Sequence, residues 1–280
     1  MDKDRTLGIV LMAMAMLTIP LVDAVAKYLS TGHSALFISW ARYLVAAVII
    51  LPIAFARHGR SCLPRRNLGA HFLRTVCLVT SMTLYFQAIS TTPLADAISA
   101  YFIGPIVAAL LAVWLLKETL SPLKIASMSL GFLGVILIVE PSTGISSGLI
   151  LAIASGVVFA IYLVATRSAS RQEDAMKTLA FQCLLGAVIL TPQAVLTWQI
   201  PATSAFVWFV ALGVLSLLSH FMSIQAFRFA DTTTLSPLVY LEIIGSVLVG
   251  YLVFGDVPAV NVFVGAALVI LAGVLLFKSN

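Results

Sequence analysis

Ten apolar segments, each long enough to cross a lipid bilayer as a helix, occupy most of this 280-residue chain. The connections between them are short, so little sequence remains for a soluble domain. Charged residues make up only 10% of the chain, whereas soluble domains carry about 25%. The pattern predicts an all-α membrane protein with ten transmembrane helices. They are expected at about residues 6–29, 34–56, 68–89, 94–116, 122–139, 147–166, 177–198, 204–227, 234–254 and 259–277.

The basic residues are distributed unevenly between the two sides of the predicted membrane. Three of the sixteen lysines and arginines, Lys27, Arg42 and Arg74, lie within the apolar segments. The other thirteen all fall in the tails, the connections or the first turn of a segment on the side of the N-terminus. Cytoplasmic loops of membrane proteins carry such an excess. We therefore expect both termini in the cytoplasm, and we attribute the net charge of +5 to this asymmetry and not to nucleic-acid binding.

The two halves of the chain are similar at a nearly constant offset. Residues 38–54 align with residues 178–194, including their prolines, at an offset of 140 positions. Gln87-Ala88 aligns with Gln225-Ala226 at an offset of 138. Five helices per half is an odd number, so the second half must cross the membrane in the opposite sense. The sequence thus predicts two inverted five-helix repeats, 1–140 and 141–280, around a central cavity, an architecture typical of secondary transporters.

Two stretches of the chain resemble a known transporter family. Residues 85–121, YFQAISTTPLADAISAYFIGPIVAALLAVWLLKETLS, are similar to the third and fourth helices of an EamA-type transporter of the drug/metabolite transporter superfamily. Residues 235–256, LSPLVYLEIIGSVLVGYLVFGD, resemble the matching part of the second repeat. The resemblance covers essentially the whole chain. It implies a ten-helix bundle in the bacterial inner membrane that moves small metabolites by alternating access. Amino-acid exporters, including exporters of aromatic amino acids, form a large part of that family.

Charges within the apolar segments mark candidate functional groups, because a charge inside a bilayer is costly. Asp23 and Lys27 lie one helical turn apart, and Arg42 lies at a similar depth in the next segment. They form either a gate or carboxylate-attracting vestibule, or a structural ion-pair network. Lys27 aligns with Arg167, so both can also serve placement in the bilayer by extending to the interface. Glu242, near the middle of its segment, is either a proton carrier, a counter-charge for an ammonium group, or a packing residue.

Three further features have structural explanations. Arg74, near the inner end of its segment, is expected to extend its side chain to the membrane surface. Glu118 and Asp256 align at an offset of 138 and are expected to stabilise the starts of the helices that follow them. Gly104-Pro105 predicts a break in its helix, and Ser236-Pro237 predicts a break at a different place in the second repeat.

Aromatic and polar residues within the segments complete the predicted site. Any one of these rings can also be a packing residue, the reading that an aromatic content of 10% favours for a single ring. The candidate substrate-binding residues are Trp40, Arg42, Tyr85, Gln87, Tyr101, Phe102, Tyr162, His220 and Tyr240, and the candidate gating or coupling residues are Asp23, Lys27 and Glu242.

The sequence lacks the motifs of common hydrolases, nucleotide-binding sites and metal sites. The four histidines lie in four different regions, and HExxH, GxSxG and GxxxxGK[ST] motifs are absent. The three cysteines have no metal-binding spacing. We therefore expect neither enzymatic activity nor a cofactor, and transport driven by a gradient or by uniport.

An aromatic-rich cavity with few charges suits amphiphilic zwitterions. We therefore predict secondary transport, in the direction of export, of neutral and aromatic amino acids and methionine. The alternatives are a small-multidrug or nucleoside-type carrier of the same superfamily, or a passive channel. The expected partners are the small-molecule substrate and the lipid bilayer, and the sequence is compatible with a monomer.

Overall fold

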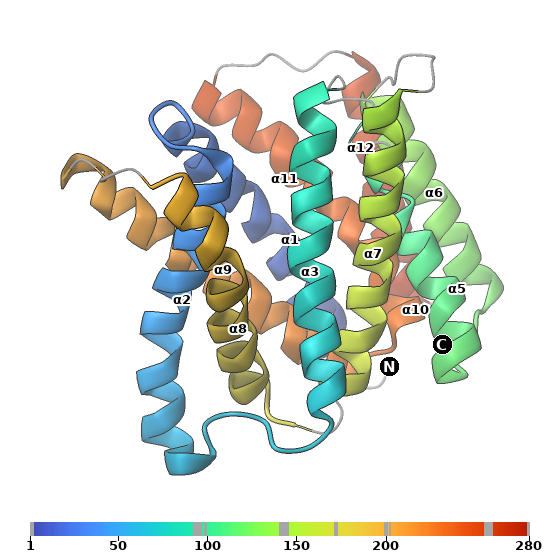
Figure 1. The fold of residues 1–280 in the computed structure, drawn as a ribbon. Helices are drawn as coiled ribbons and strands as arrows, with labels where there is room; N and C mark the ends of the chain where they lie inside the picture. Colours follow the sequence, from blue (N-terminus) through green and yellow to red (C-terminus); the bar gives the residue numbers. More distant parts are fainter. Residues whose placement is uncertain are drawn as a thin grey trace.

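A computed structural model describes residues 3–91, 97, 100–139, 146–170, 173–198, 201, 203–254 and 260–278. Every regular element in these ranges is a helix (Figure 1). The long helices are α1 (Lys3–Leu29), α2 (Ala35–His58), α3 (Leu68–Thr91), α5 (Gly104–Leu116), α6 (Pro122–Val139), α7 (Ser147–Ser170), α8 (Ala175–Leu196), α9 (Thr203–Phe229), α11 (Leu241–Val249) and α12 (Val260–Lys278). Shorter elements are the 3-10 helices η1 (Gly59–Ser61) and η2 (Ser236–Tyr240), the helix α10 (Thr232–Leu235) and a π-helical turn, η3 (Gly250–Phe254).

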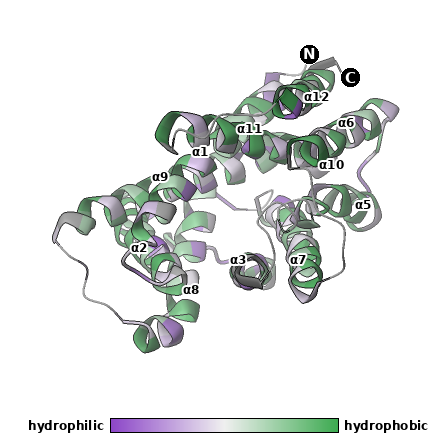
Figure 2. Ribbon diagram, turned by 90° about the horizontal axis from the view of Figure 1, so that it is seen from above, coloured by the Kyte–Doolittle hydropathy of each residue, from purple (hydrophilic) through white to green (hydrophobic). Residues whose placement is uncertain are grey.

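The ten predicted segments all correspond to helices of the structure. Within the described residues, six helical stretches are long and apolar enough to cross a membrane, and α5, α6 and α12 are shorter apolar helices. The remaining segment is α3, which carries the buried polar residues His71 and Arg74. Large apolar side chains are exposed on the outside of the bundle, among them Val48 at 64% and Phe263 at 64%. Hydrophobic residues cover nearly every helix in the view along the bundle (Figure 2), as expected for lipid-facing surfaces.

Both predicted helix breaks are confirmed. The turn at Phe102–Ile103 interrupts the fourth segment, and α5 begins at Gly104 with a proline in its first turn. In the second half, Pro237 lies in the 3-10 helix η2 between α10 and α11. The hydroxyl of Tyr240 donates a hydrogen bond of 3.2 Å to the carbonyl of Phe102. The Phe102 carbonyl at the first helix break thus receives its hydrogen bond from Tyr240 at the second break. A bilayer interior requires such pairing, because it offers backbone groups no water.

The helices pack in pairs that join distant parts of the chain. The principal pairs are α1 with α9, α3 with α7, α2 with α8 and α6 with α12. Between α3 and α7, the Ser81 hydroxyl donates to the Ser155 carbonyl at 3.0 Å and the Ser155 hydroxyl to the Ser81 carbonyl at 2.7 Å. Between α9 and α1, the Ser219 hydroxyl donates to the Ala15 carbonyl at 3.1 Å. Small and hydroxylated residues of this kind hold membrane helices together.

The two termini lie toward the end of the bundle that also holds the connection between α2 and α3 (Figure 1). At this end, the Glu173 carboxylate accepts hydrogen bonds of 3.2 Å from the backbone N–H groups of Arg65 and Arg66. Burial alone would raise the pKa of Glu173, but these two donors and the nearby Lys177 outweigh it and lower the pKa. Glu173 therefore stays ionised and fixes the α2–α3 connection to the start of α8.

Candidate functional site

Asp23 and Glu242 lie close to each other on two neighbouring helices. They lie on α1 and α11, which pack closely against each other. A Cβ added at Gly245 of α11 would be only 2.7 Å from Cγ of Pro20 on α1. The two carboxyl groups interact electrostatically with each other. Asp23 is exposed and Glu242 is partly exposed, so both carboxyl groups are accessible where α1 and α11 meet.

Tyr85 and Tyr101 lie near the two acids. Both tyrosines interact electrostatically with Asp23 and Glu242, and their ring centroids are 5.2 Å apart. Arg42, on α2, interacts electrostatically with Asp23. Two carboxyl groups beside aromatic rings form a setting that attracts a cationic group. We call Asp23, Glu242, Tyr85 and Tyr101 the acidic crevice.

A row of aromatic rings leads from the acidic crevice to a buried arginine. The ring centroids of Tyr101 and Phe159 are 5.3 Å apart, and those of Phe159 and Tyr162 are 5.6 Å apart. The guanidinium carbon of Arg74 lies 5.4 Å from the centroid of the Tyr162 ring, within the range of a cation–π interaction. The aromatic row, Tyr85 through Tyr162, therefore runs from a region with two acids and Arg42 to a region with Arg74.

Arg42 and His220 line a small pocket between α2, α8 and α9. Its other polar walls are Tyr43, Cys183 and Ser216. Tyr43 also lines a second small pocket, between α2, α3 and α8. Each pocket is of the size that holds about one water molecule. Neither is large enough for a metabolite.

Tyr43, Cys183 and Ser216 were missed by sequence reasoning. A weak signal for Ser216 exists, because it lies one helical turn before His220 and shares its face of α9. Tyr43 has no such signal. Its position depends on Gly186 of α8, where an added Cβ would be 2.6 Å from the tyrosine ring.

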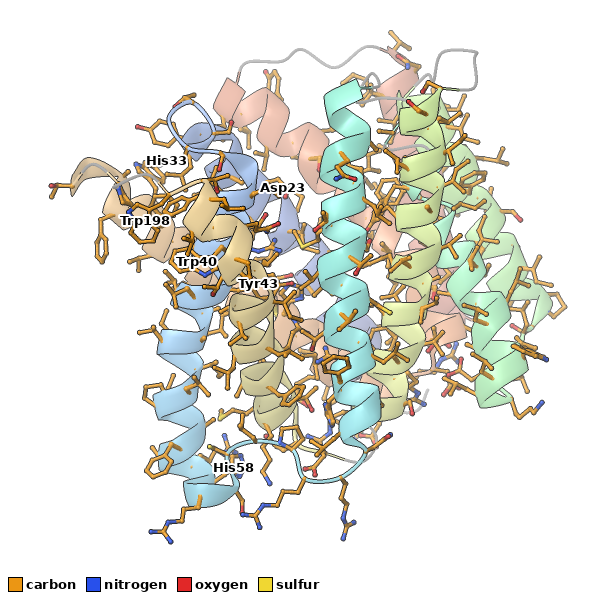
Figure 3. All side chains as sticks on the ribbon, viewed as in Figure 1. Asp23, His33, Trp40, Tyr43, His58 and Trp198 are labelled. Atoms are coloured by element: carbon orange, nitrogen blue, oxygen red, sulfur yellow. The ribbon has the colours of Figure 1, made fainter. Side chains whose placement is uncertain are left out.

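Three of the predicted substrate-binding residues make packing contacts: Trp40 lies in another cluster, and Phe102 and Tyr240 pack beside Tyr101. Trp40 packs against Phe37 and Trp198 and donates from its indole N–H to the Thr191 hydroxyl at 3.2 Å. Figure 3 shows Trp40, Trp198 and His33 in the half of the bundle away from His58. Phe102 and Tyr240 are buried against each other at the helix breaks.

The two remaining predicted residues are less well defined. Gln87 is exposed near the end of α3. Lys27 lies in α1 one turn beyond Asp23, and its side chain is outside the part of the structure that is described. Their roles stay predictions.

Arg74 does not extend to the membrane surface, so that expectation is wrong. Its side chain is fully buried, since α3 packs against both α7 and α8. Its Nε donates to the Thr166 hydroxyl at 3.2 Å, and its Nη1 donates to the Thr178 carbonyl at 3.4 Å. Neighbouring helices therefore enclose the side chain and supply hydrogen-bond partners in place of water.

The expectation that Arg167 serves placement at the membrane surface is also wrong. Arg167 is 4% exposed and lies in a network between helices. Its guanidinium forms ion pairs with Glu118, at 3.7 Å, and with Asp231, and it donates to the Phe227 carbonyl. This network ties the end of α7 to the α9–α10 connection and to the α5–α6 connection.

Glu118 stabilises a helix start, but a different one from that predicted. Its carboxylate accepts from the backbone N–H groups of Thr232 at 3.0 Å and Thr233 at 2.8 Å, the first residues of α10. It thus caps α10 from the other half of the chain and does not cap α6. Lys124, at the start of α6, donates to the Thr233 hydroxyl at 2.7 Å and to the Thr119 carbonyl at 3.0 Å.

The described residues contain no group of three or more histidine, cysteine or acidic side chains that could hold a metal ion. What the bundle does enclose is a set of charged and aromatic groups on helices from both halves of the chain. An apolar helical bundle with such an interior belongs to the class of polytopic membrane proteins that handle polar solutes.

Comparison with known proteins identifies the particular family. Residues 6–140 and residues 146–278 each match the EamA-like transporter family. The chain belongs to this family.

Named relatives and one crystal structure extend over nearly the full chain. The chain is 24% identical to the S-adenosylmethionine uptake transporter of Rickettsia felis, over 92% of this chain and 88% of the relative. It is 26% identical to the riboflavin transporter of Vibrio cholerae, over 95% and 91% of the two chains. A crystal structure with 18% sequence identity superposes with a TM-score of 0.83 over 98% of both chains, which shows a shared fold.

Proposed function

We propose that the protein is a secondary transporter for an amphiphilic metabolite that combines an aromatic ring with a cationic group. The observation that carries this proposal is the acidic crevice, where Asp23 and Glu242 interact with each other beside Tyr85 and Tyr101. Carboxylates attract a cation, and aromatic faces accept both a cation and a flat ring. The family membership supports transport of a small metabolite.

S-adenosylmethionine is the first candidate substrate. It carries a sulfonium, an ammonium, a carboxylate and a purine ring, and relatives in Rickettsia are named for its uptake. Riboflavin, for which other relatives are named, has a flat ring but no cationic group. The two acids therefore favour S-adenosylmethionine over riboflavin. Methionine and aromatic amino acids carry part of the same pattern and form the second candidate class. We propose uptake as the direction, in place of the export expected from the sequence.

Two inverted repeats, 1–140 and 141–280, form our proposal for the domain organisation. The helix pairs support it, because exchanging the halves turns α3–α7 into α9–α1 and leaves α2–α8 and α6–α12 unchanged. The serine bonds between helices support it as well. Ser81 aligns with Ser219 at an offset of 138 and Ala15 with Ser155 at 140, and each serine of the first pair donates to a carbonyl of the second.

The inner end of the proposed transporter is the end with the termini. Placement in a bacterial inner membrane with both termini in the cytoplasm is supported by the excess of basic residues on that side. The Glu118–Arg167 pair lies toward the same end, where α7 stops and α10 starts. In alternating access this pair has to separate when the inner end opens. In the sequence, Lys27 aligns with Arg167 and Asp256 aligns with Glu118. Because the repeats are inverted, we expect Lys27 and Asp256 to act at the outer end.

Binding to the purified protein tests the choice of substrate. We expect S-adenosylmethionine to raise the thermal unfolding midpoint in detergent at lower concentration than any other ligand of a small panel. The panel is S-adenosylhomocysteine, which lacks the sulfonium charge, together with methionine, tryptophan, riboflavin and adenosine. Adenosine is the control for ring stacking without charge. Stabilisation by riboflavin and not by S-adenosylmethionine would contradict the proposed role of the acidic crevice.

A further inference from the structure

Three buried polar side chains near the inner ends of α3, α7 and α8 have atoms without hydrogen-bond partners. They are Nη2 of Arg74, the hydroxyl of Tyr162, and both the oxygen and the nitrogen of the Gln182 amide. Arg74 and Gln182 are 0% exposed, and Tyr162 is 2% exposed. Buried polar groups in folded proteins are nearly always paired, so three such residues in one region call for an explanation.

Arg74 contacts α7 at Tyr162 and α8 one helical turn before Gln182. The Arg74 guanidinium lies against the Tyr162 ring, with 5.4 Å between its carbon and the ring centroid. The same guanidinium donates to the carbonyl of Thr178, and Gln182 lies one helical turn beyond Thr178 on the same face of α8. Thr166 and Thr178 accept hydrogen bonds from Nε and Nη1 of Arg74, and Nη2 is left without an acceptor.

No acidic side chain neutralises Arg74 among the residues that the structure describes. The groups that act on it electrostatically are Tyr162, Tyr43 and Cys183, none of which is a carboxylate. A purely structural arginine would be expected to have an ion-pair partner at this depth, because an unpaired charge in a membrane protein is costly. The second half of the chain has no counterpart, since Leu212 stands at the aligned position.

We propose that Arg74, Tyr162 and Gln182 form an oxyanion-binding subsite that takes the carboxylate of the transported substrate. A guanidinium presents a planar pair of N–H donors that matches a carboxylate, and the tyrosine hydroxyl and the glutamine amide add further donors. This inference rests on the proposed transport function. The aromatic row places this oxyanion subsite at the opposite end from the acidic crevice, so the two ends together suit a zwitterion with an apolar middle.

A pair of simple probes tests the oxyanion subsite without assuming a natural substrate. They are 3-phenylpropionate and 3-phenylpropionamide, which differ only in the carboxylate and are compared at equal ionic strength. We expect saturable thermal stabilisation of the purified protein by the carboxylate and none by the amide. Arg74→Gln should abolish the effect, and Arg74→Lys should retain part of it. Arg57→Gln, at an exposed arginine on the inner end of α2, should bind the probe normally.

Tyr162→Phe is the decisive variant, because it keeps the ring against Arg74 and removes only the hydroxyl. We expect a folded protein whose apparent affinity for the carboxylate is reduced about tenfold, the effect of one hydrogen bond to a charged group. It therefore decides the question even if Arg74→Gln does not fold. Normal binding of 3-phenylpropionate by Tyr162→Phe and Gln182→Leu would overturn the proposal.

The oxyanion subsite and the proposed function can fail separately. Loss of 3-phenylpropionate binding in these variants, together with no binding of S-adenosylmethionine to the wild type, would support the subsite and contradict the substrate. Equal affinity of wild type and Tyr162→Phe for S-adenosylmethionine would contradict the subsite and leave the transport function intact.

Discussion

Replacement of Glu118 by alanine is expected to destabilise the protein by about 3–5 kcal/mol, the range for removing one partner of a buried ion pair, because Arg167 would keep only the more exposed Asp231 as an ion-pair partner. Arg167 would lose its buried partner, and the backbone N–H groups of Thr232 and Thr233 would lose their acceptor. Because these contacts join the two halves of the chain, the whole bundle should unfold at a lower temperature. The measurement is the thermal midpoint of the purified variant, read from the fraction that stays monodisperse in detergent.

Lys177→Ala is the matched control for this substitution. It breaks an ion pair with Glu173 of 3.9 Å at the same end of the bundle, but Lys177 is 20% exposed and one turn from its partner. Such a pair contributes about 1 kcal/mol or less. Equal midpoints for the two variants would contradict the view that the Glu118–Arg167 pair holds the inner end closed.

Neutralisation of the acidic crevice should have the largest effect on function. We expect Asp23→Asn and Glu242→Gln each to weaken S-adenosylmethionine binding by about 10- to 100-fold, the effect of losing a hydrogen bond or ion pair to a charged group. Both substitutions are nearly isosteric, so the folded yield should stay close to that of the wild type. If Glu242 carries the coupled proton, Glu242→Gln should also change the pH dependence of exchange. The measurement is binding and exchange at equal folded yield.

Two controls separate a charge effect from a packing effect. Riboflavin has no cationic group, so any binding of it should be unaffected by either substitution. Glu173→Gln removes an acid outside the membrane-spanning helices and should leave S-adenosylmethionine binding unchanged. If Glu242→Gln binds and exchanges the substrate with unchanged affinity and pH profile, Glu242 is a packing residue.

Features encoded by local sequence could be predicted well. Helix positions follow from runs of apolar residues of a given length, and the predicted segment 122–139 has the bounds of α6. The breaks at Gly104-Pro105 and Ser236-Pro237 follow from the chemistry of proline, which lacks a backbone N–H. Asp23 and Glu242 stood out as unmatched charges in apolar segments, although their interaction with each other depends on how α1 packs against α11.

Features decided by long-range packing could not be predicted. Glu118 precedes α6 in the sequence, yet it caps α10, more than 110 residues away, because the two halves meet there. Arg74 looked like an interfacial arginine because it lies close to the start of its segment. Its burial depends on α7 and α8 covering that face of α3, which no local pattern encodes. The contacts of Trp40 with Phe37 and Trp198 likewise depend on packing between helices and could not be predicted.

Radiolabelled counterflow in proteoliposomes tests the central claim, carrier-mediated movement of S-adenosylmethionine, most directly. Liposomes loaded with unlabelled S-adenosylmethionine should take up the labelled compound transiently above its external concentration, and the rate should saturate. Glu242→Gln at equal reconstituted amount should show at least a tenfold lower rate at low substrate concentration. Flux that rises linearly with concentration and shows no overshoot would indicate a passive pore. No flux of S-adenosylmethionine beside overshoot of riboflavin or of an amino acid would contradict the proposed substrate.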